Sequence, residues 1–380
     1  MPVWYNRRQT GAGDVQIVVA TDVTVAGGVD RYVLALMVAL RRAGHVAVLV
    51  CEQRSASPLA SQSRRYGFSV KSLPLYRQWY AAAEVEAACV TVLTQIRPDG
   101  VHVVTGSPRS CLPLRAAAIT RGVPLMITES QVDEDLVLTD SQRSAIRHSY
   151  AGAAAVVFVS AGNRETMLAA TGCTSVRSVV IRNGVDIAHF EQWRRGCLRP
   201  SRPARLITVA RLSPEKSIDT LVAAVCLLPD DLVREAVVFG DGPCRNSLSG
   251  QIEALGQTSR VVLAGWDGAV AARLCEFDLF VLPSVAEGMP YALLEAMAVG
   301  LPIVCSDVPG NVEAVAGGAA GLVVTRGDAE ALAAGIAHSL RRPADTEART
   351  QSALQRVRRH HDLTTAMDRT ARLWYGLLQT

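Results

Sequence analysis

Short runs of β-branched and aliphatic residues alternate with amphipathic segments along almost the whole chain, and this alternation limits the possible folds more than any other feature. The runs are apolar on both faces, which is typical of parallel strands covered by helices on each side of a sheet. Helices such as 29–42 and 160–170 are expected between them. We expect strands at 15–21, 46–51, 68–73, 101–105, 123–128, 154–159 and 176–182.

The alternation lapses once, at 190–204, where FEQWRRGCLRPSRPA is rich in Pro and Arg and is typical of a linker. Beyond it the pattern restarts with the apolar runs ARLITVA, EAVVFG, RVVLAG, FDLFVLPS, LPIVCSD and AGLVV. The chain has 380 residues, more than one hydrophobic core usually covers. We therefore predict an α/β fold with two doubly wound parallel-sheet domains, at 1–190 and 204–360, followed by a lone helix at 361–380.

Composition argues against several classes of protein. No segment approaches the roughly 18 uncharged apolar residues of a membrane span, and we expect no signal peptide, because the first residues lack an apolar core. The nine cysteines form no CxxC or CxxH pair, which favours reduced thiols, a cytoplasmic protein and no bound metal. The net charge of +4 is not gathered into a tail or interleaved with aromatic residues, so nucleic acid is not an expected partner.

The segment VARLSPEKS at 209–217 is the first candidate for a ligand site. In open parallel sheets, ligands bind at the carboxyl ends of the strands, and two facing sheets form a cleft there. Arg211 ends a predicted strand and Lys216, one of only two lysines in the chain, falls in the helical turn that follows. Two cations beside a helix N-terminus favour a bound anion, since charge and helix dipole then act together. The alternative is a solvated Arg and Lys on a loop.

Two glycine-rich turns also follow predicted strands. Gly240 and Gly242 lie in FGDGPCR at 239–245, and Gly27 and Gly28 lie in VAGGVDRYV at 25–33. Glycine at such a turn lets a ligand approach the backbone closely. Each turn alone is a weak indication, since many strand-to-helix turns look similar. Neither is a GxGxxG sequence, which argues against a dinucleotide-dependent dehydrogenase.

The segment AEGMPYALLEAMAVG at 286–300 carries two acids of different setting. Pro290 suits the start of a helix and Gly300 its end, which predicts a helix over 291–299 with Glu295 on it and Glu287 in the loop before it. A charged side chain rarely lies on such an apolar helix unless something pairs with it. Either Glu295 is a core acid paired with an arginine and Glu287 a capping acid, or both acids face the cleft.

These motifs together resemble the retaining glycosyltransferases of the GT4 family. EGMPYALLE has the form of that family's paired acids, and LPS, ARLSPEK and GDG precede it in the family's order. RNGVD at 182–186 and GGV…R at 27–31 match elements of the family's first domain. The resemblance covers essentially the whole chain. It implies a GT-B fold, in which two Rossmann-like domains face each other across a cleft and the last helix usually crosses back to the first domain.

The resemblance also implies roles for individual residues on the second, donor-binding domain. Glu295 would bind the ribose hydroxyls of a nucleotide sugar, and Glu287 would contact the transferred sugar. Arg211 and Lys216 would neutralise the leaving diphosphate, so that neither a metal ion nor a cofactor is expected. The remaining donor contacts on the second domain would come from the backbone of Gly240, Gly242, Gly288, Met289 and Pro290. Gly27 and Gly28 of the first domain would add theirs from across the cleft.

The acceptor side departs from the family pattern. Many members carry a His after the fifth strand, where this chain reads ESQVDED. Glu129, Ser130, Asp133 and Asp135 take that place, and Glu134 adds a fourth acid. The acids either solvate a loop or attract and orient a positively charged acceptor. The second interpretation predicts an aminocyclitol acceptor, as in an aminoglycoside antibiotic pathway.

We therefore expect a retaining, metal-independent enzyme that transfers a hexose or amino-hexose from a nucleotide-diphosphate sugar, with UDP-sugars favoured, to a hydroxyl of a small acceptor. Three alternatives stay open: a lipid or oligosaccharide acceptor, a nucleotide-sugar epimerase on the same fold, and a non-catalytic partner of an active transferase. An epimerase would need further acid or base residues around the sugar. A degenerate partner usually loses the cations or acids that this chain keeps.

Overall fold

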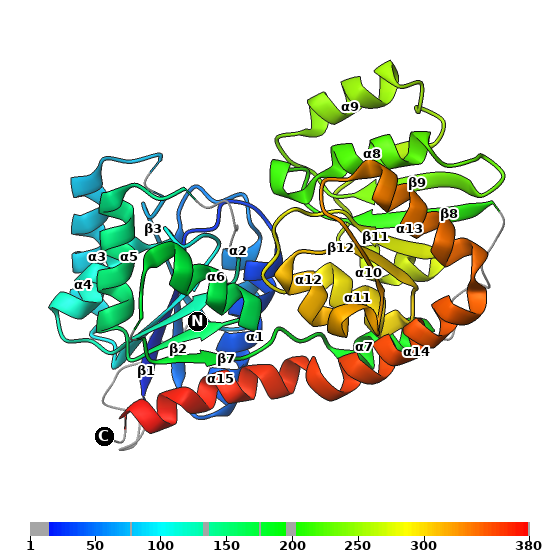
Figure 1. Cartoon of the computed structure of the whole chain (residues 1–380). Coiled ribbons are helices and arrows are strands. Elements are labelled where there is room, and N and C mark those ends of the chain that lie inside the picture. Colours follow the sequence, from blue (N-terminus) through cyan, green and yellow to red (C-terminus); the bar gives the residue numbers. More distant parts are fainter. Residues whose placement is uncertain (1–14, 77, 132–136, 175, 195–202, 379–380) are drawn as a thin grey trace.

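The computed structural model describes residues 15–378, except 77, 132–136, 175 and 195–202. Two parallel sheets, each with helices on both faces, form the two halves of the molecule (Figure 1). The predicted α/β architecture with two doubly wound sheets is confirmed. The positions of the seven predicted strands of the first sheet agree with the structure to within two residues at each end.

The first sheet has seven strands in the order β3-β2-β1-β4-β5-β6-β7. All neighbouring strands pair in parallel, and the winding direction reverses between β1 and β4, the position at which sheets of this kind usually bind ligands. The strands are β1 (Gln16–Thr21), β2 (Val46–Glu52), β3 (Ser69–Leu73), β4 (Gly100–Thr105), β5 (Leu125–Glu129), β6 (Ala155–Phe158) and β7 (Ser178–Val180).

Six helices of the described residues accompany this sheet before the chain leaves the first domain. In the first of them, apolar residues recur three or four positions apart and are buried, as at Tyr32, Leu36 and Leu40. The later helices, from the third to the sixth, cover the opposite face of the sheet. The helices are α1 (Gly28–Arg42), α2 (Leu59–Arg65), α3 (Ala82–Ile96), α4 (Leu112–Thr120), α5 (Asp140–Gly152) and α6 (Ala161–Thr171).

The second sheet has six parallel strands in the order β10-β9-β8-β11-β12-β13. Its strands are β8 (Ala204–Val209), β9 (Val233–Phe239), β10 (Val261–Gly265), β11 (Leu279–Leu282), β12 (Ile303–Ser306) and β13 (Leu322–Val324). Its helices are α8 (Ile218–Cys226), α9 (Arg245–Ala254), α10 (Val270–Arg273), α11 (Tyr291–Val299), α12 (Pro309–Ala314) and α13 (Ala329–Arg341). The apolar clusters on its two faces are separate, as expected when helices cover both sides of a sheet.

The predicted linker at 190–204 begins as a helix. Helix α7 (Ile187–Arg194) buries Phe190, with Ile187 and Trp193 partly buried beside it, against the core of the second domain. The Pro- and Arg-rich composition that indicated a linker comes after these apolar residues, and 195–202 lie outside the described residues.

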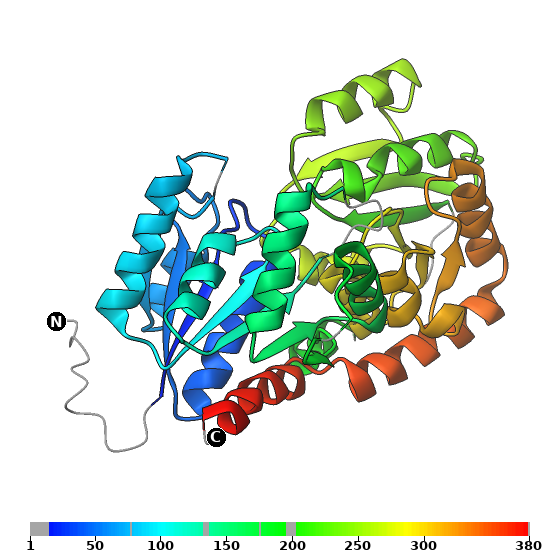
Figure 2. The same cartoon turned by 60° about the vertical axis from the view of Figure 1, so that its left-hand side comes forward.

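The end of the chain returns to the first domain. Helix α14 (Pro343–His360) packs on the second domain, and α15 (Leu363–Leu378) then runs along α1, as both views of the ribbon show (Figure 2). Trp374 is fully buried, with its ring over Gly100, where a Cβ atom would overlap it. Its Nε1 donates to Nδ1 of His102 at 3.4 Å, so α15 is part of the first domain's core.

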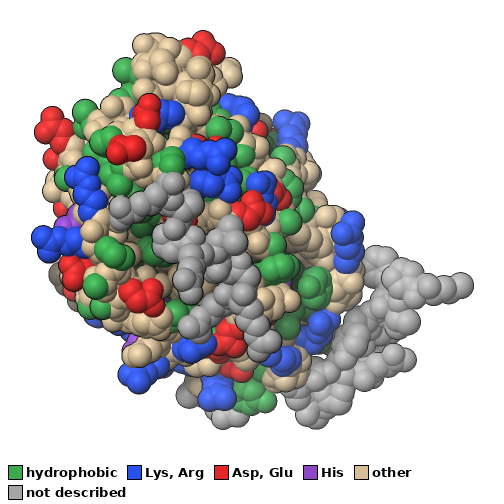
Figure 3. Space-filling view, turned by 90° about the vertical axis from the view of Figure 1, so that its right-hand side faces the viewer, with side chains coloured by type: hydrophobic (Ala, Val, Ile, Leu, Met, Phe, Trp, Pro, Cys, Tyr) green, Lys and Arg blue, Asp and Glu red, His purple; other side chains and the backbone are tan. Residues whose placement is uncertain are grey.

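Figure 3 shows the side on which the second domain faces the viewer, with side chains of the described residues coloured by type. Acidic and basic side chains are interspersed there (Figure 3). Within the described part of the chain, no helix has the length and apolar character to cross a membrane.

Candidate active site

Two loops at the carboxyl ends of neighbouring strands β8 and β11 form the centre of the candidate site. After β8 the chain passes Arg211 and forms a separate 3-10 turn over Pro214–Lys216. Ser217 is left-handed (φ 48), and α8 begins only after it. The sequence had suggested that Lys216 lies in the first turn of the helix. In the structure it lies in the separate 3-10 turn that precedes α8.

Lys216 and Glu287 join these two loops. The Nζ of Lys216 donates to Oε1 of Glu287 at 2.8 Å, and the hydroxyl of Ser284 donates to the same oxygen at 2.8 Å. The two charged side chains are 14% and 7% exposed. Glu287 also lines a small hollow together with Asn163 of α6, so the pair lies where the second domain meets the first.

Arg211 is exposed, and its side chain has no hydrogen bond or ion pair with any described residue. The turn that carries it is fixed by close backbone packing. A Cβ atom at Gly240 or Gly242 would overlap the carbonyl group of Ala210 or Leu212, and Gly240 has a φ of +142°. These two glycines are therefore explained by the packing of the β9 turn on the Arg211 turn, and their contact with a donor stays a prediction.

Helix α11 presents a second group suited to an anion. It begins at Tyr291 and ends before Gly300, as predicted, and no side chain caps its N-terminus. Its first backbone amides therefore receive no side-chain cap from Pro290, and the helix dipole favours an anion at this end. Among the described residues, no three His, Cys, Asp or Glu side chains are grouped to hold a metal ion.

Glu295 pairs with an arginine, as one of the two interpretations of the sequence required. It is 3% exposed, and its partner is Arg31 on α1 of the first domain. Burial lowers the pKa of Arg31, while the side chain keeps about half of its exposure. The ion pair thus lies between the domains, and the predicted contact of Glu295 with ribose would require Arg31 to share or release it.

The Gly27–Gly28 turn lies at the same boundary. A Cβ atom at Gly28 would approach the ring of Tyr291 to 2.8 Å, so glycine is needed for the second domain to close here. Gly27 caps α1, and its amide donates to Oδ2 of Asp30 at 3.3 Å. Burial raises the pKa of Asp30 to about 6, although Ser57 donates a hydrogen bond of 2.6 Å to the carboxylate.

The loop between Glu287 and α11 is held from the first domain. Gly288 lies so close to the carbonyl oxygen of Ser130 that a Cβ atom would overlap it. The carbonyl of Met289 accepts a hydrogen bond of 2.8 Å from Nδ2 of Asn183. The carbonyl of Asn183 in turn accepts from Nδ1 of His361 at 2.9 Å, just where α14 gives way to α15. The loop at 287–290 is thereby connected to the junction of α14 and α15, where the chain crosses back to the first domain.

Glu313 makes a further connection between the domains. This residue of α12 accepts hydrogen bonds from the amides of Ala161 at 2.7 Å and Gly162 at 3.4 Å, at the N-terminus of α6. It also pairs with Nε of Arg182 at 2.7 Å. A carboxylate at a helix N-terminus is favoured by the helix dipole. Glu313 therefore stabilises the closed arrangement of the domains.

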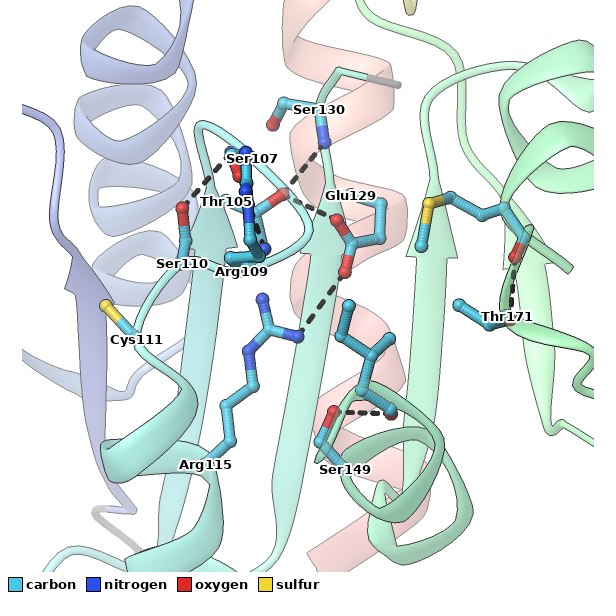
Figure 4. Close-up of polar contacts among 12 residues, drawn as sticks. Thr105, Ser107, Arg109, Ser110, Cys111, Arg115, Glu129, Ser130, Ser149 and Thr171 are labelled. Atoms are coloured by element: carbon cyan, nitrogen blue, oxygen red, sulfur yellow. Dashed lines mark hydrogen bonds and ion pairs between the residues drawn. The ribbon is translucent and has the colours of Figure 1, made fainter. Parts of the chain in front are cut away.

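The predicted acceptor residues fall into three different settings. Glu129 is fully buried and points toward Arg115, 3.5 Å away, and not into the cleft as expected (Figure 4). The physical reason is that Glu129 is the last residue of β5, and its side chain turns to the α4 side of the sheet. Ser130 follows, and its buried hydroxyl has no hydrogen-bond partner among the described residues. Outside the described residues lie Asp133, Glu134 and Asp135.

Comparison with protein families decides the class of this site. Residues 26–189 match the model for Glycosyltransferase Family 4, and residues 189–356 match the model for Glycosyl transferases group 1. The two matches meet at α7 and together run through both domains. The chain is therefore built from two glycosyltransferase domains, a family 4 domain followed by a group 1 domain.

Individual relatives match parts of this glycosyltransferase. The putative colanic acid biosynthesis glycosyltransferase WcaL of Salmonella typhimurium is 34% identical over 171 residues, 43% of this chain and 42% of the relative. The UDP-Gal:alpha-D-GlcNAc-diphosphoundecaprenol alpha-1,3-galactosyltransferase of Escherichia coli is 34% identical over 143 residues, 35% of this chain and 37% of the relative. The chain thus spans less than half the length of these relatives.

Solved structures match the glycosyltransferase over nearly its full length. Anabaena Alr3699/HepE in complex with UDP and glucose superposes with a TM-score of 0.78 at 19% identity, covering 95% of this chain and 100% of that one. Together with the two parallel sheets, this likeness confirms the predicted GT-B fold.

The site residues that sequence reasoning missed in this glycosyltransferase make contacts between the domains. They are Arg31, Asn183 and Glu313, whose partners lie more than 100 residues away in the chain. Two of them carried a signal, since Arg31 belongs to the GGV…R element and Asn183 to RNGVD. Glu313 lies in no motif that had been singled out.

Proposed function

We propose that this glycosyltransferase transfers a hexose or amino-hexose from a UDP-sugar to a hydroxyl of a glycan acceptor, with retained configuration and without a metal ion. The observation that carries the proposal is the mostly buried Lys216–Glu287 pair at the boundary with the first domain, where Lys216 belongs to a loop that also carries Arg211, whose side chain has no ion pair among the described residues. A diphosphate suits this site, because two cations and an uncapped helix N-terminus lie at the ends of neighbouring strands.

The chemistry follows from the positions of these groups. As the bond between the sugar and the diphosphate breaks, negative charge grows on the leaving phosphate, where Arg211, Lys216 and the α11 dipole would stabilise it. Glu287 would then exchange part of its contact with Lys216 for hydroxyls of the transferred sugar. The acceptor hydroxyl would attack from the face that the diphosphate leaves and give its proton to the leaving phosphate oxygen, so that configuration is retained.

The proposed acceptor is based on the relatives and on the position of Glu129, which differs from the one predicted from the sequence. One relative's name specifies UDP-Gal as donor and a GlcNAc-diphosphoundecaprenol as acceptor, and another belongs to colanic acid biosynthesis. We propose a sugar of a lipid-linked or polymeric glycan. The aminocyclitol expectation rested on four acids facing the cleft at the end of β5, and one of them, Glu129, is paired inside the first domain instead. No relative reported above points to an antibiotic pathway.

A two-step assay tests the proposal. Thermal-shift measurements with UDP-, GDP-, dTDP- and ADP-sugars in EDTA should select UDP-sugars. The selected donor is then incubated with GlcNAc-diphosphopolyprenol or with an aminocyclitol, and the product's anomeric configuration is determined by NMR. Transfer to the first acceptor with retention supports the proposal. Inversion, a strict need for Mg²⁺, or transfer to the aminocyclitol alone would contradict it.

A further inference from the structure

A series of buried polar contacts joins α4, β4 and β5 of the first domain (Figure 4). Nη1 of Arg115, on α4, lies 3.5 Å from Oε1 of Glu129. The hydroxyl of Thr105, at the end of β4, donates to Oε2 of Glu129 at 2.8 Å. The same hydroxyl accepts from the amide of Ser130 at 3.3 Å. The contacts therefore run without a gap from a guanidinium group to one backbone amide.

The ion pair at the start of this series of contacts is poorly suited to stabilising the fold. Arg115 and Glu129 are fully buried, and the guanidinium nitrogens have no hydrogen-bond partner among the described residues. Burial raises the pKa of Glu129, even though Arg115 and Thr105 act in the opposite direction. Desolvation of such a pair can exceed its mutual attraction, and apolar replacements are often as stable. The pair therefore calls for a role other than stability.

The far end of this series of contacts, at Ser130, indicates that role. Ser130 is the residue whose carbonyl oxygen lies against Gly288, with no room for a side chain between them. Gly288 directly follows Glu287, which pairs with Lys216. A shift of the Ser130 backbone would therefore change how the loop that carries Glu287 rests against the first domain.

We infer that Arg115, Glu129 and Thr105 position the Ser130 backbone against Gly288, and so align the acceptor face of the first domain with the Glu287 loop. The three residues act through Ser130 and touch no substrate. The inference rests on the proposed transferase function. It predicts that loosening these contacts slows transfer without weakening the binding of UDP, because Arg211, Lys216 and Glu295, the side chains expected to bind the nucleotide, lie on the second domain.

Thr105→Val is the first test, since it keeps the shape of the side chain and removes only the hydroxyl link. The matched control is Thr171→Val, another fully buried threonine of the first domain, whose hydroxyl donates to a carbonyl of its own helix at 2.7 Å. We expect Thr105→Val to lower kcat about tenfold, since small misplacements of reacting groups reduce rates to this extent or more. Its Kd for UDP should match wild type, and the control should match wild type in both measurements.

The second test replaces the ion pair by apolar residues, in the double variant Arg115→Met/Glu129→Leu. Its melting temperature should equal or exceed that of wild type, while kcat should fall as in Thr105→Val. Wild-type kcat in both variants would overturn the inference. A fall in kcat that is matched by losses of melting temperature and UDP affinity would also overturn it, by revealing a purely structural role. Wild-type protein that binds no nucleotide sugar, by contrast, would contradict the proposed function itself.

Discussion

Replacing Lys216 by Met should separate the structural contribution of the Lys216–Glu287 pair from its catalytic one. The two side chains are mostly buried and meet at 2.8 Å, and Ser284 is the other donor to the same carboxylate oxygen. Removing one partner of a fully buried pair costs about 3–5 kcal/mol. Because Ser284 stays and both side chains keep some exposure, we expect the free energy of unfolding to fall by about 2 kcal/mol.

The assay is urea unfolding of Lys216→Met, Glu287→Gln and the double variant, with transfer kinetics on each. The double variant leaves no unpaired charge, so it should recover about 1–2 kcal/mol relative to the sum of the single changes. Transfer should nevertheless stay roughly tenfold to a thousandfold slower in both Lys216 variants. Lys71→Met, at the chain's only other lysine, is the control. Additive destabilisation, or wild-type turnover in Lys216→Met, would refute the reasoning.

Three further predictions concern the contacts between the domains. Asn183→Ala removes the hydrogen bond to Met289 and should lower kcat about tenfold; unchanged kcat would show that this bond does not position the loop. Glu313→Gln removes the charge at the α6 N-terminus and should increase the radius of gyration in small-angle X-ray scattering without nucleotide; an unchanged radius would argue against its part in closure. Burial lowers the pKa of His361 from 6.5 to about 4, so its neutral form stabilises the fold above pH 6.5, and this is lost as the pH falls toward 4. The loss amounts to about 3 kcal/mol and should be absent in His361→Gln, as measured by urea unfolding at both ends of this pH range.

The fold was predictable because its signals are local. A strand covered on both faces must be apolar on both faces, so β1 and β11 stand out in the sequence without knowledge of their neighbours. Helix α11 was bounded correctly by Pro290 and Gly300, whose backbone preferences act on their own position. Helix α7 was missed because three apolar residues are a weaker signal than the Pro and Arg residues that follow them.

The partners of the charged residues were not predictable in the same way. Glu129 belongs to a run of acids that looks solvated, but as the last residue of β5 it points to the interior, where Arg115 is available. Glu295 required a partner, yet only the closure of one domain on the other selects Arg31. Strand periodicity predicts which face of a sheet a residue occupies only if that residue is known to belong to the strand. The boundaries of strands are the least certain part of a sequence prediction.

Calorimetric titration of UDP and of uridine, both in EDTA, tests most directly whether Arg211 and Lys216 bind the diphosphate of a nucleotide sugar. We expect wild type to bind UDP, and the double variant Arg211→Ala/Lys216→Ala to bind it at least tenfold more weakly, since two charge-assisted contacts are lost. The affinity for uridine should be the same in both proteins. An equal loss for uridine, or an unchanged affinity for UDP in the double variant, would contradict the assignment of these two cations to the diphosphate.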